Sequence, residues 1–290
     1  MSIGNRQIVL CPNPKKDKGH ETSLKAYEIL EEAGHDVVIS PVSYLPNEKP
    51  LPDTVKSMPL SESAKNAGLI VCFGGDGTIL KTARAVMNTP VPILGVNLGH
   101  KGFMAELEPN DIDLLLKAAE GNYKPISRMM IDVELIRDGK VIYSDSALNE
   151  AVVCGTATTI KVSAYGDGSK ITEYTGDGII VATPTGSTAY SLSAGGSLVE
   201  PTADNILLTP ICAHIMTVRP FVLAPDRLVT IRTRENDGKQ IWLSVDGGEL
   251  IPFLPSDELK IKKSKHHTIM AQVSNKSFYD IVFGKLGERT

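Results

Sequence analysis

The stretch Leu69-Ile70-Val71-Cys72-Phe73-Gly74-Gly75-Asp76-Gly77-Thr78 decides the fold of the first half of the chain. Its apolar part predicts a short buried strand, and apolar residues on one face over 78–87 predict a helix. Glycines between a strand and a helix let the backbone approach a ligand closely, and the helix start offers unpaired N–H groups to an anion. Phosphate is therefore the ligand that this turn predicts.

Asp76 is unusual in a phosphate-binding turn, because a carboxylate repels phosphate unless it binds a metal ion or takes a proton. The turn matches neither the dinucleotide fingerprint G-x-G-x-x-G nor the P-loop G-x-x-x-x-G-K-[ST]. Its functional interpretations are a general base or a contact to Mg²⁺. The alternative is an ordinary glycine turn in which the Asp caps the helix.

Strands and helices alternate through the first 126 residues. Short apolar runs predict strands at 7–11, 36–40 and 92–96, and periodic apolar residues predict helices at 21–33 and 110–120. This alternation is typical of a parallel sheet covered by helices on both faces. We therefore predict an N-terminal α/β domain with a doubly wound parallel sheet at 1–126.

From residue 127 the pattern changes to extended runs, separated by hairpin signals such as Asp138-Gly139 and Gly166-Asp167-Gly168. The same pattern resumes from Leu228 onward. Alternating short strands with turn signals are typical of sandwiches and barrels. The second domain, at 127–273, is expected to be larger and mainly β, with a β-sandwich-like fold.

Charge and hydropathy exclude several classes of function. The chain has 30 Lys and Arg residues against 34 Asp and Glu residues, a net charge of −4, so no nucleic-acid partner is expected. Its longest uncharged run, 178–199, is mostly Gly, Ser, Thr and Pro, which predicts no transmembrane helix and no membrane partner. The apolar run at 8–11 is too short for a signal peptide, so we expect a cytoplasmic protein.

The four cysteines, Cys11, Cys72, Cys154 and Cys212, are widely spaced and contain no C-x-x-C pair. They fit neither a disulfide framework nor a zinc site. We expect buried, reduced thiols at these positions and no metal site made by the protein alone.

A second polar segment lies at 176–196. A predicted strand at 179–182 leads into Thr183-Pro184-Thr185-Gly186-Ser187-Thr188-Ala189-Tyr190-Ser191, where hydroxyl groups and a Tyr gather between glycines. Such a cluster can bind ribose hydroxyls, an amide or the edge of a base. A helix start capped by Ser or Thr explains the same residues equally well.

Both features, in this order, resemble the NAD kinase family, whose members use ATP to phosphorylate the 2′-hydroxyl of the adenosine ribose of NAD. The resemblance runs from Gly74 to Gly247. It departs at Lys101, where the family often has an apolar residue. The other matching segments are Gly95-Val96-Asn97-Leu98-Gly99 with Gly102-Phe103, the pair Asn149-Glu150, Asp177 to Gly196, Pro210…His214…Arg219-Pro220, and Val245-Asp246-Gly247.

The resemblance implies a role for each site residue. Asp76 would accept or orient the proton of the 2′-hydroxyl and help to hold the Mg²⁺ that enters with ATP. Asn149 and Glu150 would contact the adenosine ribose of NAD, and Asp177 its nicotinamide end. Around the phosphates would lie Gly74, Gly75, Gly77 and Thr78, and the rest of the NAD pocket would be formed by Phe103, Thr185, Thr188, Ala189 and Tyr190.

The resemblance also implies NAD and ATP as substrates, a homodimer or homotetramer, and a C-terminal segment, 274–290, that returns to the first domain. Two other functions stay open at this point. One is a lipid or sphingoid kinase with a similar glycine turn, against which the segment from Asp177 to Gly196 argues. The other is a dinucleotide-binding sensor without catalysis, against which the presence of Asp76 argues.

Overall fold

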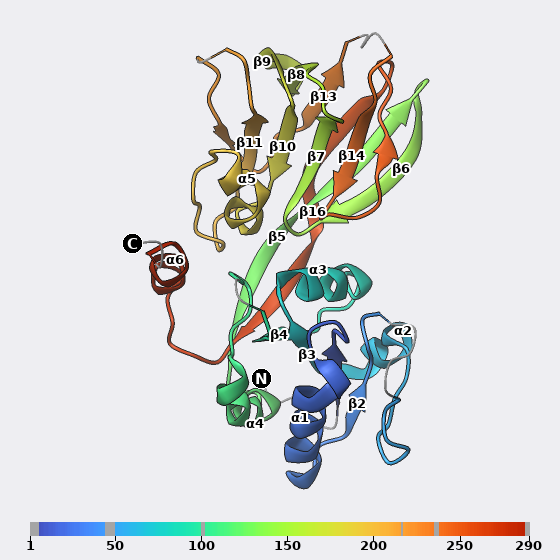
Figure 1. Cartoon of the computed structure of the whole chain (residues 1–290), viewed down its shortest axis with the longest axis vertical. Coiled ribbons are helices and arrows are strands. Elements are labelled where there is room, and N and C mark those ends of the chain that lie inside the picture. Colours follow the sequence, from blue (N-terminus) through green and yellow to red (C-terminus); the bar gives the residue numbers. More distant parts are fainter. Residues whose placement is uncertain (1–5, 44–49, 100–101, 216, 235–237, 288–290) are drawn as a thin grey trace. The chain divides into compact units, whose positions relative to one another are not determined.

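The computed structural model describes residues 6–43, 50–99, 102–215, 217–234 and 238–287 (Figure 1). Lys101, the departure from the family pattern, lies outside them. The chain divides into two compact units. Unit 1 is Met1–Ser127 with Thr268–Thr290, and unit 2 is Arg128–His267. The strands β5 (Lys124–Arg137) and β16 (Glu258–Gln272) each have residues in both units.

Unit 1 is built on a parallel sheet in the order β2-β1-β3-β4, with the last part of β16 next to β4. Every residue of β3 is buried, as a continuous apolar run in a parallel sheet requires. The strands are β1 (Gln7–Pro12), β2 (Val37–Ile39), β3 (Ala67–Gly74) and β4 (Ile93–Asn97).

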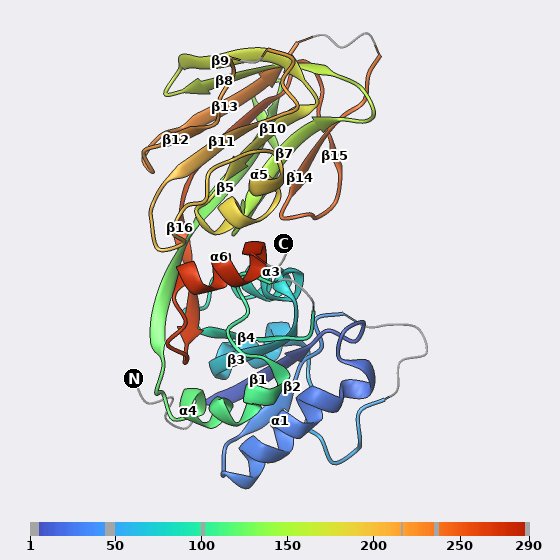
Figure 2. The ribbon, with the colours of Figure 1, turned by 60° about the vertical axis from the view of Figure 1, so that its left-hand side comes forward.

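Helices cover both faces of this sheet (Figure 2), which confirms the doubly wound fold. On one face, α1 (Glu21–Glu32) and α4 (Leu115–Ala119) share a core with alternate residues of the strands. On the other face lies α3 (Asp76–Ala85), where the Cys72 thiol donates a hydrogen bond of 3.2 Å to Thr82. The short helical pieces are η1 (Lys18–His20), α2 (Leu60–Ser63), η2 (Ala64–Asn66) and η3 (Pro109–Leu114).

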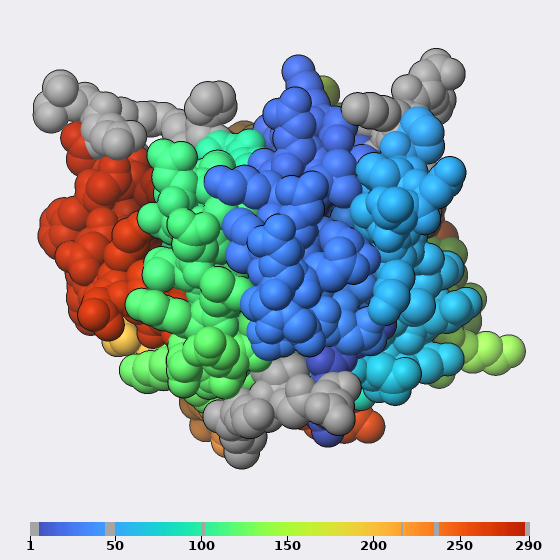
Figure 3. Space-filling view, turned by 90° about the horizontal axis from the view of Figure 1, so that it is seen from below, coloured from blue at the N-terminus to red at the C-terminus, as the bar shows by residue number. Residues whose placement is uncertain are grey.

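The helix predicted at 110–120 is only partly correct, because its first half is the 3₁₀ helix η3. A capping box between Glu108 and Asp111, with Pro109 inside the first turn, tightens this start. Figure 3 shows α1 on the same face, between the η3–α4 segment and residues 50–63. The backbone N–H of Lys56 donates to the Tyr27 hydroxyl at 3.4 Å, which ties that second segment to α1.

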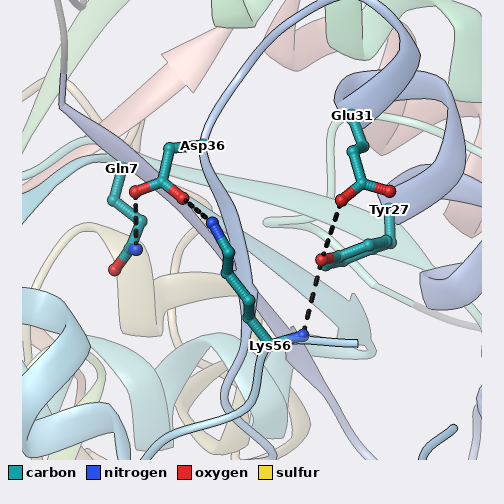
Figure 4. Close-up of polar contacts among 5 residues, drawn as sticks. All are labelled: Gln7, Tyr27, Glu31, Asp36 and Lys56. Atoms are coloured by element: carbon teal, nitrogen blue, oxygen red, sulfur yellow. Dashed lines mark hydrogen bonds and ion pairs between the residues drawn. The ribbon is translucent and has the colours of Figure 1, made fainter. Parts of the chain in front are cut away.

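Polar contacts connect residues at the amino edge of this sheet (Figure 4). The Asp36 carboxylate, next to β2, accepts hydrogen bonds from Gln7 at 2.9 Å and Lys56 at 2.8 Å. The hydrogen bond from Lys56 lowers the pKa of Asp36. The glycine turn at 74–77 lies at the opposite, carboxyl edge, where open α/β sheets bind their ligands.

The chain returns to unit 1 along β16, and Glu106 holds the segment that follows this strand. The Glu106 carboxylate accepts hydrogen bonds from the backbone N–H groups of Val273 at 3.2 Å and Ser274 at 2.7 Å. The helix α6 (Phe278–Gly287) follows. None of its residues is buried, and Tyr279, Phe283 and Leu286 are exposed.

Unit 2 consists of two β-sheets that enclose one core, which confirms the β-sandwich-like fold. One sheet is antiparallel, in the order β12-β11-β10-β7-β14-β15, and the other contains β5, β6, β16, β13, β8 and β9. The remaining bounds are β6 (Lys140–Ala147), β7 (Glu150–Gly155), β8 (Ile160–Gly166), β9 (Ser169–Gly176), β10 (Gly178–Ala182), β11 (Ile206–Ile211), β12 (Phe221–Leu223), β13 (Val229–Thr233), β14 (Ile241–Val245) and β15 (Ile251–Pro252).

Candidate active site

The glycine turn of unit 1 joins β3 to α3. Gly75 is the N-cap of α3, and no side chain caps this helix start. A Cβ atom at Gly74 would lie 2.2 Å from Thr78 Oγ1, so the protein itself requires glycine there. At Gly75 and Gly77 a Cβ atom would meet nothing within 4 Å. The packing of the protein therefore leaves open space beside these two glycines.

Asp76 is the first residue of α3, but its carboxylate does not cap the helix. It accepts hydrogen bonds from the backbone N–H groups of Phe103 at 2.8 Å and Met104 at 3.2 Å. A Cβ atom at Gly102 would lie 2.8 Å from Asp76 Oδ1, so the loop can approach only because this residue is glycine. Burial raises the pKa of Asp76, and the N–H groups of the loop and the charge of Lys285 oppose that rise.

The neighbouring loop is held by β4. The Asn97 side chain accepts a hydrogen bond from the Gly99 backbone N–H at 3.1 Å and donates to the Glu108 carboxylate. A Cβ atom at Gly95 would lie 2.7 Å from Ile79 Cδ1 and 2.9 Å from Ala105 Cα. The glycines of this motif therefore serve the close packing of α3 and the loop against β4.

The pair Asn149-Glu150 lies at the connection between β6 and β7 in unit 2, and Glu150 is the first residue of β7. Both side chains are buried. Asn149 Oδ1 and Glu150 Oε2 have no hydrogen-bond partner within the described structure. Burial, with the nearby charge of Asp246 second, raises the pKa of Glu150 to about 8. Buried polar atoms without partners are uncommon and mark a place where a ligand can supply the missing bonds.

The backbone at this pair is held on both sides. From one side, the Asp246 carboxylate accepts hydrogen bonds from Leu148 N at 2.8 Å, Asn149 N at 2.8 Å and Glu150 N at 3.0 Å. From the other, the Thr183 hydroxyl donates to the Leu148 carbonyl at 2.5 Å, and its backbone N–H donates to the Asn149 carbonyl at 2.8 Å. Neither Asp246 nor Thr183 was predicted to have a role of its own from the sequence.

The hydroxyl cluster begins directly after β10. Its predicted helix is the 3₁₀ turn η4 (Thr185–Thr188) followed by the single turn α5 (Tyr190–Ser193). The Thr188 hydroxyl donates to the Thr185 carbonyl at 3.1 Å, and Ala189 N donates to the Gly186 carbonyl at 3.0 Å. A Cβ atom at Gly186 would lie 2.2 Å from the Asn149 carbonyl, so this turn packs directly on the Asn149-Glu150 pair.

Asp177, Tyr190 and Cys212 form a third polar group in unit 2. The pKa of the Cys212 thiol is raised, first by its hydrogen bond to Asp177. Burial raises the pKa of Tyr190, although 44% of this residue is exposed. Cys212 is exposed and Cys154 is half-buried, so the prediction of buried thiols is wrong for these two and correct for the two cysteines of unit 1. Cys212 has a positive φ of 46°, which turns it out of the strand end.

The predicted site residues thus form two sets, each described within its own unit. Unit 1 holds Gly74 to Thr78 and Phe103, and unit 2 holds the rest. Phe103 contributes its backbone N–H to the Asp76 carboxylate. Asp246 could have been suspected from its Asp-Gly turn signal, but only the structure shows which N–H groups it binds.

The chain is similar to known proteins over almost its whole length. Residues 8–122 match the family model of the ATP-NAD kinase N-terminal domain, and residues 148–273 match that of the ATP-NAD kinase C-terminal domain. An NAD kinase of Natranaerobius thermophilus is 37% identical over 286 residues, which cover 97% of this chain and 98% of that protein. An NAD kinase of Acetivibrio thermocellus is 35% identical, with 98% of each chain covered.

Two solved structures are similar over almost the whole chain. Yeast NADH kinase complexed with NADH has a TM-score of 0.81 at 25% identity, covering 98% of this chain and 88% of that one. An NAD kinase from Archaeoglobus fulgidus in complex with ATP has a TM-score of 0.75 at 26% identity, covering 98% and 100%. Fold and site thus define a kinase, an enzyme that transfers a phosphoryl group. The chain belongs to the ATP-NAD kinase family.

No described helix of the chain is long and apolar enough to cross a membrane.

Proposed function

We propose that this kinase, whose reaction converts NAD to NADP, transfers the γ-phosphate of ATP to the 2′-hydroxyl of the adenosine ribose, with Asp76 as the catalytic base. The observation that carries the proposal is the Asp76 carboxylate. It is held by two backbone N–H groups at the start of a helix, and burial raises its pKa toward the working range of a base.

In the proposed step, the 2′-oxygen attacks the γ-phosphorus of ATP while Asp76 takes the hydroxyl proton. The bond between the γ-phosphorus and the oxygen that bridges it to the β-phosphate breaks, and ADP leaves. Phosphoryl transfer of this kind needs little beyond positioning and charge neutralisation. The hydrogen bonds from Phe103 and Met104 fix the orientation of the carboxylate for that task.

The phosphates of ATP are proposed to lie at Gly75 and Gly77, with Gly74 and Thr78 shaping the turn. The support is the open space beside the first two glycines and a start of α3 that no side chain caps. Such a helix start attracts anions through its free N–H groups and its dipole.

A divalent cation such as Mg²⁺ is proposed to enter with ATP. The described residues contain no group of three or more His, Cys, Asp or Glu side chains that could hold a metal ion by itself. The single carboxylate of Asp76 fits a Mg²⁺ ion that keeps most of its ligands from phosphate and water. When bound, this ion would neutralise phosphate charge, and Asp76 is the residue that would hold it.

NAD is proposed to bind through Asn149 and Glu150 at the adenosine ribose and through Asp177 at the nicotinamide end. Support comes from the unpartnered oxygens of Asn149 and Glu150, since ribose hydroxyls can donate to both. The rest of the proposed pocket is Phe103, Thr185, Thr188, Ala189 and Tyr190.

A homodimer or homotetramer in the cytoplasm is also proposed. The edge strand β12 exposes Phe221 and Val222, which is typical of a surface that pairs with another chain. All four cysteines are free thiols, as in proteins of reducing compartments.

The test is a coupled assay in which the purified chain receives ATP, Mg²⁺ and NAD, and an NADP-specific dehydrogenase reports the product. NADP should form only when all three are present. ³¹P NMR should place the new phosphate on the 2′-oxygen. Product at the 3′-oxygen would overturn the proposed position of transfer, and full rates with Asp76→Asn would overturn the proposed base.

A further inference from the structure

Asp246 lies at the end of β14, outside every residue set assigned above to catalysis or binding. It has a positive φ of 47° and is followed by Gly247 with a φ of 66°. Asp and Gly are the residues that tolerate this left-handed conformation, and together they form a tight turn. The turn brings the Asp246 carboxylate back onto the backbone of residues 148–150.

This carboxylate satisfies three successive backbone N–H groups. Its Oδ2 accepts from Leu148, and its Oδ1 accepts from both Asn149 and Glu150, at distances from 2.8 to 3.0 Å. Hydrogen bonds to a carboxylate are stronger than those between neutral groups. The backbone N–H of Asp246 also donates to the Glu150 carbonyl at 3.0 Å.

Thr183 binds the carbonyls of the same turn. Its hydroxyl donates a hydrogen bond to the Leu148 carbonyl, and its backbone N–H donates one to the Asn149 carbonyl. The backbone of 148–150 is therefore held from both sides, whereas Asn149 Oδ1 and Glu150 Oε2 remain without partners among the described residues. A rigid backbone that presents unsatisfied, buried acceptors is preorganised for a ligand that donates hydrogen bonds.

We propose that Asp246 is a positioning residue that fixes the Asn149-Glu150 turn for binding of the NAD ribose. It touches no substrate and acts through the backbone alone. The inference rests on the proposed contact of Asn149 and Glu150 with NAD. The charge of Asp246 also raises the pKa of Glu150, as expected for two carboxyl groups in one buried place.

The test uses two variants of graded effect. Asp246→Gly keeps the left-handed conformation and removes all three acceptor contacts. Asp246→Asn keeps one oxygen that can accept hydrogen bonds from Asn149 N and Glu150 N. Its amide NH₂ replaces the oxygen that accepts from Leu148 N, so that hydrogen bond is lost. The matched control is Asp167 in the turn after β8, which has a φ of 50°, precedes a glycine and accepts from Leu228 N at 2.9 Å.

Each protein is titrated with NAD in the absence of ATP to obtain Kd, and kcat and the KM for ATP are measured alongside urea unfolding. Asp246→Gly should raise the Kd for NAD at least tenfold, and Asp246→Asn at least threefold. The KM for ATP should stay within twofold of the parent value. Asp167→Gly and Asp167→Asn should leave all these constants within twofold.

Glu150→Gln separates the inference from the function on which it rests. If Glu150→Gln weakens NAD binding but Asp246→Asn and Asp246→Gly do not, the positioning role is overturned alone. If Glu150→Gln also leaves the Kd unchanged, the ribose contact and the inference both fail. If Asp246→Gly does not unfold cooperatively, Asp246→Asn alone tests the positioning role, which then requires at least a threefold rise in its Kd for NAD. Equal rises in the Kd for NAD and the KM for ATP would show general destabilisation and overturn the positioning role.

Discussion

The carboxylate of Asp76 accepts a hydrogen bond of 2.8 Å from the backbone N–H of Phe103, so the proposed base also holds the loop that follows β4. The same side chain therefore has a structural role in addition to its proposed catalytic one. Any substitution at Asp76 has to be assayed for both effects.

Asp76→Asn should lower kcat by about 10²- to 10⁴-fold, because the amide keeps the shape but cannot take a proton. NAD binding should stay within twofold, since the proposed ribose contacts lie elsewhere in the chain. The amide offers one acceptor in place of two to Phe103 and Met104, so the free energy of unfolding should fall by about 0.5–1.5 kcal/mol. Steady-state kinetics, NAD titration and urea unfolding measure the three effects.

Asp17→Asn is the matched control for this variant. Asp17 is buried and accepts hydrogen bonds from the backbone N–H groups of Thr22 at 2.9 Å and Ser23 at 3.1 Å at the start of α1. Asp17→Asn should lower the free energy of unfolding by a similar amount and leave kcat unchanged. A rate for Asp76→Asn within a few-fold of the parent would remove Asp76 as the base.

The glycines of the turn should separate into two groups. Gly74→Ala should lower the free energy of unfolding, because its Cβ atom would lie 2.2 Å from Thr78 Oγ1. Gly77→Ala should raise it by about 0.5–1 kcal/mol, because Ala is the better residue inside a helix and meets nothing within 4 Å. The same variant should nevertheless weaken ATP binding.

Gly75→Ala should weaken ATP binding as Gly77→Ala does. It should not raise the free energy of unfolding, because Gly75 is the N-cap of α3 and not an interior residue. Thermal unfolding and titration with ATP in the presence of Mg²⁺ check this set. Unchanged ATP affinity in both variants would mean that the phosphates bind elsewhere.

Removal of divalent cations should abolish phosphoryl transfer. Mg²⁺ usually enters such sites on nucleotide phosphates with few protein ligands. Exhaustive treatment with EDTA should stop NADP formation, and added Mg²⁺ should restore it, whereas NAD titration without ATP should give the same Kd before and after. Full activity in the presence of EDTA is the result that contradicts this expectation.

At pH 9, where Glu150 is mostly ionised, Glu150→Gln should weaken NAD binding by roughly tenfold, because a charge-assisted hydrogen bond contributes about 1.5–3 kcal/mol. With its pKa at about 8, Glu150 becomes ionised in the wild type as the pH rises from 6.5 to 9. In the proposed site, an ionised Glu150 would accept hydrogen bonds from ribose hydroxyls and repel a 2′-phosphate. The ratio of the Kd for NADP to the Kd for NAD should therefore rise with pH in the wild type and stay flat in the variant. Equal ratios in both proteins would remove Glu150 from the ribose site.

The raised pKa of Glu150 predicts that the stability of the protein depends on pH. The pKa of Glu150 rises from about 4.3 in the unfolded chain to about 8 in the folded one, so the folded state binds the proton more tightly. Its contribution to stability is complete below the unfolded pKa and is lost as the pH rises through the folded pKa. Urea unfolding should thus show Glu150→Gln gaining stability relative to the wild type between pH 5 and pH 9. A difference that is the same at both values would contradict the raised pKa.

Local patterns predicted much of the fold. The apolar run that becomes β3 and the glycine turn after it depend on neighbours in sequence, and both were placed correctly. No bounds were predicted for β7, which begins at the buried side chain of Glu150. The length of β16 could not be predicted from the sequence, because Lys and His residues fill its exposed positions and the polar residues Ser264 and Thr268 are buried in its middle.

Candidate site residues could be proposed from the sequence in two ways. Asp76 stands out by the chemistry of its own glycine turn, whereas the Asn149-Glu150 pair was proposed only from the family resemblance. The hydrogen bonds of Asp246 connect it to residues 96–98 positions earlier in the chain, a distance over which local sequence carries no information. The register between β7 and β14 determines which backbone groups the Asp246 carboxylate can bind. That register is a property of the folded sheet.

The most direct test of the account follows the phosphate itself. The wild-type chain is incubated with Mg²⁺, NAD and ATP carrying a ³²P label in its γ-phosphate, and the products are separated by chromatography. The label should appear in NADP, with one ADP formed for each NADP. Label found only in inorganic phosphate, or in no product while NAD and ATP both bind, would contradict it.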